Sequence, residues 1–236
     1  MSLLFALNTP SVAILGQAER FPVNRIYCVG RNYAAHAREM GANPERESPF
    51  FFSKPANAVA ENGAMLPFPS RTEDLHHEVE LVVALAGEGL DAKGSNLSLA
   101  EAKAAVYGYA VGIDFTRRDL QAQAKDKGRP WDTAKGFDDS APITAITPAQ
   151  QAGAIDEAHI SLKVNGELRQ QGHISDLIWS IPELIAELST YYRLRCGDLI
   201  FTGTPSGVAA VQPGDVLEGH VDGLEALRIT LGPRSR

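Results

Sequence analysis

Short apolar runs, rich in β-branched and aromatic residues, recur along the chain and predict a protein built mainly of strands. Asn165-Gly166 and Asp222-Gly223 each lie between two such runs, and both dipeptides favour tight hairpin turns. The predicted strands cover residues 25–29, 79–85, 106–113, 160–164, 199–202, 216–221 and 224–231.

Helical patterns are fewer. The segment "SIPELIAELSTYY" (180–192) has a capping residue, Ser180, a proline in the first turn and an apolar stripe at helical spacing. "NYAAHAREMG" (32–41) and "LSLAEAKAAVYG" (97–108) predict two further helices. We therefore expect an α+β fold that is mainly β, with a few short peripheral helices. We divide it into a small N-terminal segment, residues 1–60, and a β-rich catalytic body, residues 61–236.

Composition narrows the possible functions. The chain has 236 residues, 44% of them hydrophobic, which is enough for a sizeable core. A net charge of -7 argues against a nucleic-acid-binding surface but not against binding of an acidic small molecule, since local charge governs that. No apolar run approaches the ~20 residues that span a bilayer. Residues 1–20 have the pattern of neither a signal nor a transit peptide, so we expect a cytoplasmic protein. Cys28 and Cys196 are predicted to be buried thiols.

The stretch "DLHHEVELVV" (74–83) places Glu78 and Glu80 two residues apart at a predicted strand. Residues i and i+2 of a strand point to one face, so the two carboxylates project together and His76 extends the row. They either bind a divalent cation, which offsets their repulsion and lost hydration, or lie on the solvent-facing side of the strand. These residues alone leave both interpretations open.

A third carboxylate, Asp114, ends the run "VYGYAVGID" (106–114), and a site with only oxygen ligands suits Mg²⁺, Mn²⁺ or Ca²⁺. Arg118 and Gln121 follow, and they share a face if a helical turn begins there. An arginine next to a metal site can hold a substrate carboxylate through two hydrogen bonds. The alternative is an exposed charged turn.

His36 and Glu39 are neighbours on the predicted helix within residues 32–41. A carboxylate beside an imidazole raises its basicity and orients it, as in a general base, although a solvated surface pair is the more common meaning of that spacing. Lys135 is a candidate donor to a developing oxyanion or a surface lysine. "FTGTPSGV" (201–208) either offers hydroxyl and amide groups to an anion or forms an ordinary turn.

Six segments occur in a characteristic order: "YCVGRNYAAHAREMG", "PFFFSKPANAV", "LHHEVELVV", "GYAVGIDFTRRDLQ", "GRPWDTAKGFDDSAP" and "DLIFTGTPSGV". With this combination the chain resembles the fumarylacetoacetate hydrolase family from roughly residue 24 to the end. It is most similar to the short acylpyruvate and fumarylpyruvate hydrolases, which include some oxaloacetate decarboxylases. The resemblance implies a mixed β-roll and a homodimer.

The resemblance also implies a site. Mg²⁺ or Mn²⁺ would be bound by Glu78, Glu80 and Asp114. The catalytic positions of the family match His36, Glu39 and Lys135. Its substrate-contacting positions match Arg118, Gln121 and Thr204. For a substrate with a second carboxylate, the candidate cations are Arg31, Arg38 and Arg46, near a lid around residues 37–50. The roles of His76 and His77 stay open.

Together these positions predict a metal-dependent C–C bond hydrolase of aromatic-compound catabolism. It would cleave a 3-acylpyruvate, with fumarylpyruvate preferred, to pyruvate and a carboxylic acid. The alternatives are an oxaloacetate decarboxylase, an isomerase of an unsaturated 2-hydroxy diacid and, from a different class, a non-catalytic metal- or ligand-binding protein. We expect neither a nucleic acid nor a membrane as a partner.

Overall fold

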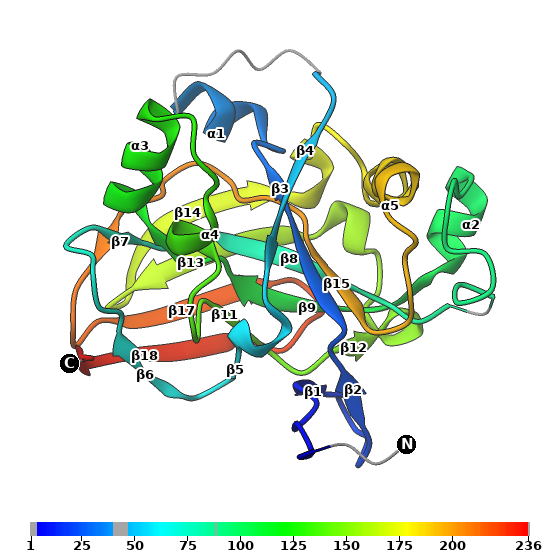
Figure 1. Ribbon diagram of the computed structural model, residues 1–236, viewed down its shortest axis with the longest axis horizontal. Helices are drawn as coiled ribbons and strands as arrows, with labels where there is room; N and C mark the ends of the chain where they lie inside the picture. Colours follow the sequence, from blue (N-terminus) through cyan, green and yellow to red (C-terminus); the bar gives the residue numbers. More distant parts are fainter. Residues whose placement is uncertain (1–3, 40–46, 88, 236) are drawn as a thin grey trace.

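A large mixed sheet runs through the centre of the computed structural model, which describes residues 4–39, 47–87 and 89–235 (Figure 1). Its middle strand, β8 (Val79–Leu85), pairs antiparallel with β9 (Val106–Ile113) and with β15 (Asp198–Phe201). Across the sheet the order is β4 (Phe50–Lys54), β3 (Arg25–Gly30), β15, β8, β9, β11 (Ala141–Ile143) and β5 (Val59–Glu61), and β12 (Thr147–Pro148) also pairs with β9. The sheet is mixed because β3 pairs parallel with β15, and β11 with β5.

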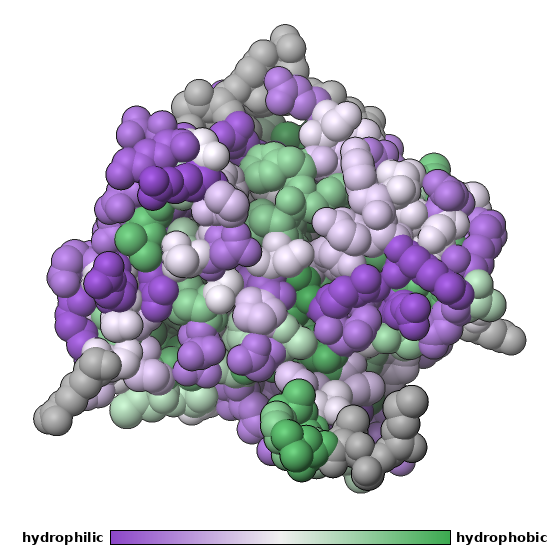
Figure 2. Space-filling model, viewed as in Figure 1, coloured by the Kyte–Doolittle hydropathy of each residue, from purple (hydrophilic) through white to green (hydrophobic). Residues whose placement is uncertain are grey.

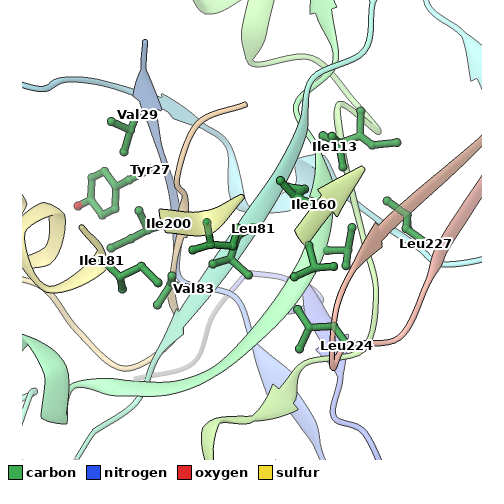
Figure 3. Close-up of a cluster of buried hydrophobic side chains, with 14 of the residues drawn as sticks. Tyr27, Val29, Leu81, Val83, Ile113, Ile160, Ile181, Ile200, Leu224 and Leu227 are labelled. Atoms are coloured by element: carbon green, nitrogen blue, oxygen red, sulfur yellow. The ribbon is translucent and has the colours of Figure 1, made fainter. Parts of the chain in front are cut away.

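A second sheet packs against one face of the first. Its order is β14 (Glu167–His173), β13 (His159–Val164), β17 (Val216–Val221), β18 (Leu227–Arg234) and β6 (Met65–Phe68). Figure 3 shows the apolar layer between the sheets, with Leu81 and Val83 of β8 on one side and Ile160 of β13 and Leu227 of β18 on the other. These side chains are fully buried, so the main core lies between the two sheets.

The remaining elements are short. β7 (Leu75–His76) pairs with β10 (Thr116–Arg117) and with β16 (Ala210–Val211), and β1 (Ser11–Ala13) pairs with β2 (Arg20–Pro22). The helices are α1 (Ala34–Glu39), α2 (Leu99–Ala104), α3 (Arg118–Asp126), α4 (Asp132–Lys135) and α5 (Ile181–Tyr191). Single 3-10 turns are η1 (Ala56–Ala58), η2 (Ala149–Gln151), η3 (Ile155–Glu157) and η4 (Ile174–Asp176). In Figure 1, α1, α3 and α4 lie towards one end of the large sheet and α2 and α5 towards the other. In the part of the chain that the structure describes, no helix is both long enough and apolar enough to cross a membrane.

The predicted fold class, mainly β with short peripheral helices, is confirmed. The tight turn at Asn165-Gly166 is confirmed too, because both residues have positive φ, 52° and 81°, and join β13 to β14. A tight turn does form at Asp222-Gly223, because Leu224 N donates to Val221 O at 3.1 Å, but the two-residue hairpin predicted there is wrong. Because β18 starts only at Leu227, opposite Gly219, the connection from β17 is longer than two residues.

Two other predictions concern the burial of the cysteines and the division of the chain at residue 60. Cys28 is buried as predicted, but the prediction for Cys196 is wrong, because that thiol is exposed in the connection between α5 and β15. β3 and β4 come from residues 1–60 and are part of the large sheet. The division of the chain at residue 60 stays a prediction.

Candidate active site

Three carboxylates converge where β8 and β9 meet. Glu78 directly precedes β8 and Asp114 directly follows β9, and the pairing of Val79 with Ile113 brings these two strand ends together. One carboxylate oxygen from each of Glu78, Glu80 and Asp114 lies within 4.8 Å of the other two. All three side chains are buried, which excludes the solvent-facing interpretation of Glu78 and Glu80.

The strand geometry explains this placement. Both faces of β8 are buried, so its alternation separates two cores rather than core from solvent. Val79, Leu81 and Val83 face the second sheet, while Glu80 lies on the other face with Val82, next to a smaller apolar cluster. His76 does not extend this row, because it belongs to β7 in a different sheet.

Three cations surround the triad. The Lys135 ammonium lies 2.8 Å from Glu78 Oε2 and 2.6 Å from Asp114 Oδ2. The Arg118 Nη2 lies 2.6 Å from Glu78 Oε1. The Lys54 ammonium, which sequence analysis did not single out, lies 2.8 Å from Asp114 Oδ1 and also donates to the main-chain carbonyl of Lys135. The two lysines are thus held together next to Asp114.

Within the triad, the pKa values of Glu78 and Glu80 are shifted in opposite directions. Burial opposes ionisation of Glu78, but the charges of Lys135 and Arg118 hold the pKa of that carboxyl below its usual range. Burial and the neighbouring Asp114 and Glu78 raise the pKa of Glu80 well above its usual range. One oxygen of Glu80 accepts a hydrogen bond from the amide of Gly203, at 2.8 Å. A divalent cation would offset the crowding that raises this pKa, and three converging carboxylates are a donor set that suits Mg²⁺ or Mn²⁺. The residues present therefore fit such an ion.

A His–Glu pair is held beside the triad by α1 and the loop after β15. His36 Nδ1 lies 3.2 Å from Glu39 Oε2, and both oxygens of Glu39 accept from the amide of Gly207. His36 is 6% exposed. Burial lowers the pKa of the imidazole, while Glu78 and Glu39 act in the opposite direction. The ring is therefore poised to be neutral near pH 7 and to accept a proton.

Most of the predicted site residues line a single cleft. Its lining includes Arg31, His36, Glu78, Glu80, Arg118, Gln121, Lys135 and Thr204. Arg118 and Gln121 begin α3 and share a face as expected, because Arg118 Nη1 donates to Gln121 Oε1 at 2.7 Å. Asp114 lies beneath this lining, fully buried, whereas Glu39 is exposed and contacts His36 without being part of the lining. Arg38 lines a different surface hollow, next to Asp176. Arg46 and the middle of the predicted lid, residues 40–46, are outside the described residues.

A buried glutamine missed by sequence analysis ties the site together. Gln170 of β14 accepts from Val79 N at 3.1 Å and from His77 Nδ1 at 2.8 Å, so that nitrogen carries the proton. Its amide nitrogen donates to Thr204 Oγ1 at 2.8 Å, and Thr204 donates to Val79 O at 2.7 Å. His77 is thus part of a hydrogen-bond network below the triad. His76 lies nearer the cleft, where its Nε2 is 2.9 Å from Asp74 and its Nδ1 accepts from Arg118 at 3.4 Å.

Comparison with known proteins now identifies the family. Residues 25–231 match the family described as fumarylacetoacetate (FAA) hydrolase C-terminal. The chain belongs to the fumarylacetoacetate hydrolase family. The resemblance seen in the six segments is thereby confirmed.

Individual relatives cover most of the chain. It is 44% identical over 187 residues to a fumarylpyruvate hydrolase from Ralstonia sp., which covers 79% of this chain and 94% of the relative. It is 41% identical over 204 residues to an oxaloacetate tautomerase from Escherichia coli, covering 86% and 90%. The crystal structure of a fumarylpyruvate hydrolase from Pseudomonas aeruginosa, in complex with Mn²⁺ and pyruvate, superimposes with a TM-score of 0.93 at 50% identity. It covers 98% of this chain and 100% of that one.

Proposed function

We propose that this family member is a metal-dependent hydrolase that cleaves the C3–C4 bond of a 3-acylpyruvate, with fumarylpyruvate as the preferred substrate. The proposal is supported by a buried carboxylate triad and a His–Glu pair that meet in one cleft. Relatives described as fumarylpyruvate hydrolases support the choice of substrate. Glu78, Glu80 and Asp114 would hold Mg²⁺ or Mn²⁺, and one solved relative contains Mn²⁺ together with pyruvate, a product of this cleavage.

The chain's own residues account for the steps of hydrolysis. When bound, the divalent cation supplies positive charge and Lewis acidity at the 2-oxo acid end of the substrate. Arg118 and Gln121 face the cleft and can hold the substrate carboxylate. His36, oriented by Glu39, takes a proton from water, and the hydroxide adds to the C4 carbonyl while the Lys135 ammonium stabilises the oxyanion. The C3–C4 bond then breaks, and its electron pair stays with C3 as an enolate. The carboxylic acid leaves, and protonated His36 returns a proton to C3 to give pyruvate.

The observation that carries this proposal is the buried His36 held by Glu39, since hydrolysis needs a base for water whereas decarboxylation does not. His36→Ala should lower kcat/KM for fumarylpyruvate about 10²–10⁴-fold, the usual contribution of general-base catalysis. Decarboxylation of oxaloacetate, measured on the same variant, should fall much less. If both activities fall equally while the variant still binds Mn²⁺ and oxalate, the pair does not activate water.

Oxaloacetate tautomerase is a second candidate, favoured by relatives of that description from Escherichia coli and, at 43% identity, from Rattus norvegicus mitochondria. Tautomerisation moves a proton between the C2 oxygen and C3, and the same imidazole can accept it at one atom and return it at the other. With oxaloacetate as substrate, a tautomerase removes the enol absorbance without forming pyruvate, whereas a decarboxylase forms pyruvate and CO₂. With fumarylpyruvate, only the hydrolase releases pyruvate together with fumarate. A side-by-side product assay therefore separates these activities.

Assembly and location stay predictions. We expect a homodimer in the cytoplasm, without a nucleic-acid or membrane partner. Size-exclusion chromatography with light scattering tests the dimer, and a molar mass near that of a single 25.4 kDa chain would contradict it.

A further inference from the structure

Two cations at the mouth of the cleft have no part in the hydrolysis described above. The Arg31 guanidinium lies over the Phe50 ring, 5.7 Å from its centroid, and the Lys125 ammonium lies 5.2 Å from the centroid of the Trp131 ring. The two rings meet edge to face with centroids 5.5 Å apart. All four side chains line the same cleft as the triad. They form one continuous ledge of cation, ring, ring and cation, which we call the mouth ledge.

The mouth ledge carries positive charge that the described residues do not neutralise. Lys54, Arg118 and Lys135 are each paired with a carboxylate of the triad. By contrast, no carboxylate among the described residues lies within 4.0 Å of the charged groups of Arg31 or Lys125. Burial, and then the positive charges of Arg118 and Arg31, lower the pKa of Lys125. The mouth therefore suits an anionic group of a ligand.

The backbone at the mouth ledge supports a functional role. Arg31 has φ +58°, a left-handed conformation that is uncommon for a long side chain and that is found more often at ligand-binding sites. The preceding Gly30 is paired with Phe50, and a Cβ on it would lie 2.0 Å from the Phe50 ring. The chain thus turns sharply to place the ring and the guanidinium together. Figure 2 shows apolar side chains over the middle of β4 next to hydrophilic ones over α3, as expected for an aromatic wall beside cations.

We propose that the mouth ledge is the subsite for the far end of the substrate and selects a flat, unsaturated acyl group that ends in a carboxylate. This inference rests on the proposed acylpyruvate hydrolase function. The conjugated part of a fumaryl group can lie against Phe50 and Trp131, and its carboxylate can bind Arg31 and Lys125. An acetyl group has neither feature. The second carboxylate of oxaloacetate is attached where an acyl group would begin, so it stays near the triad and does not reach the mouth.

The test compares fumarylpyruvate with acetylpyruvate on variants of the mouth ledge. Lys125→Met should raise KM for fumarylpyruvate about tenfold, the loss expected for one charge-assisted hydrogen bond, and should leave acetylpyruvate kinetics unchanged. Lys125→Arg should restore most of the loss. Arg31→Gly should show the same selectivity at an unreduced melting temperature, because glycine accepts positive φ without strain. Lys127→Met, two residues further on and outside the cleft lining, is the matched control and should behave as wild type.

Failure of this subsite and failure of the proposed function give different results. If Lys125→Met and Arg31→Gly change both substrates equally, or neither, the subsite is wrong although the hydrolase function stands. If the wild type cleaves neither compound, the hydrolase function is wrong, and calorimetry with Mn²⁺-loaded protein then measures binding without turnover. A selective loss of affinity for fumarylpyruvate in the variants would still support the subsite, and equal affinities would overturn it.

Discussion

The pH dependence of catalysis should report on a single residue, His36. Burial lowers the pKa of its imidazole, against the opposing charges of Glu78 and Glu39. A general base acts in its neutral form, so kcat/KM should rise with pH through the pKa of His36 and level off above it. Because that pKa is lowered, the acid limb should lie below the usual histidine value of about 6.5. A pH profile with fumarylpyruvate measures this, and an acid limb above that value would contradict the assignment.

Glu39→Gln separates the two effects of Glu39 on the His36 ring, which are its hydrogen bond and its negative charge. The amide can keep the hydrogen bonds to His36 and Gly207 but removes the negative charge that raises the histidine pKa. The acid limb should therefore move to lower pH, while the plateau rate falls because the base is weaker. Glu167→Gln, an exposed position on β14, is the control and should leave the profile unchanged. A limb that moves to higher pH would show that Glu39 does not act on His36.

Site residues that stand close together in the sequence were predicted well. Site residues whose partners lie far along the chain were missed. Glu78 and Glu80 stand two apart, and Arg118 and Gln121 three apart, so their shared faces follow from local geometry. Lys54 meets Asp114 from 60 residues away, and Gln170 meets Val79 from 91 away. Those contacts depend on which strands pair and on how the two sheets pack, which local spacing does not determine.

At the scale of elements, the position of Glu80 depends on a glycine opposite it. Gly112 of β9 pairs with Glu80, and a Cβ there would lie 2.6 Å from the Phe201 ring and 2.7 Å from a Val82 methyl. Gly112→Ala should therefore lower the free energy of unfolding by about 1–3 kcal/mol, the usual effect of overpacking, and weaken Mn²⁺ binding by displacing β8 from β9. Urea unfolding and metal titration measure the two effects.

A strand glycine with more space provides the control for that substitution. A Cβ on Gly232 of β18 would have its nearest neighbours at 3.3 Å, so Gly232→Ala should be milder and should not alter metal affinity. Equal destabilisation by both substitutions, or an unchanged metal affinity in Gly112→Ala, would contradict the prediction that the metal site depends on the close contact at Gly112.

Elements with a continuous apolar pattern were predictable to the residue, and those shaped by turns were not. β8 and β9 have the predicted bounds because apolar residues mark almost their whole length, and β17, in which buried residues alternate with more exposed ones, has its predicted bounds as well. The start of β18 was misplaced by three residues, because Leu224 is apolar and buried yet belongs to the preceding turn. His76 was assigned to the wrong strand, since the break between β7 and β8 has no Gly or Pro to mark it.

Buried charges of both signs are concentrated at the centre of the large sheet. A chain of net charge -7 buries three carboxylates together, and among the described residues three cations contact two of them. Glu80 is the carboxylate without an ion pair in that set, and its neighbours raise its pKa. A divalent cation should therefore stabilise the folded protein as a whole through Glu80, because it binds only where the strands bring the triad together.

Glu80→Gln should abolish the difference in stability between the metal-free and metal-loaded states. In wild type, Mn²⁺ at a hundred times its Kd should add about 2.7 kcal/mol to the free energy of unfolding. In Glu80→Gln that gain should disappear, because a charged ligand is lost. The metal-free variant should be at least as stable as the metal-free wild type, since like-charge repulsion is relieved and the amide oxygen can still accept from Gly203. Glu157→Gln, at an exposed position, should keep the full metal-dependent gain. Thermal unfolding with and without Mn²⁺ measures all three proteins, and an undiminished gain in Glu80→Gln would remove Glu80 from the metal site.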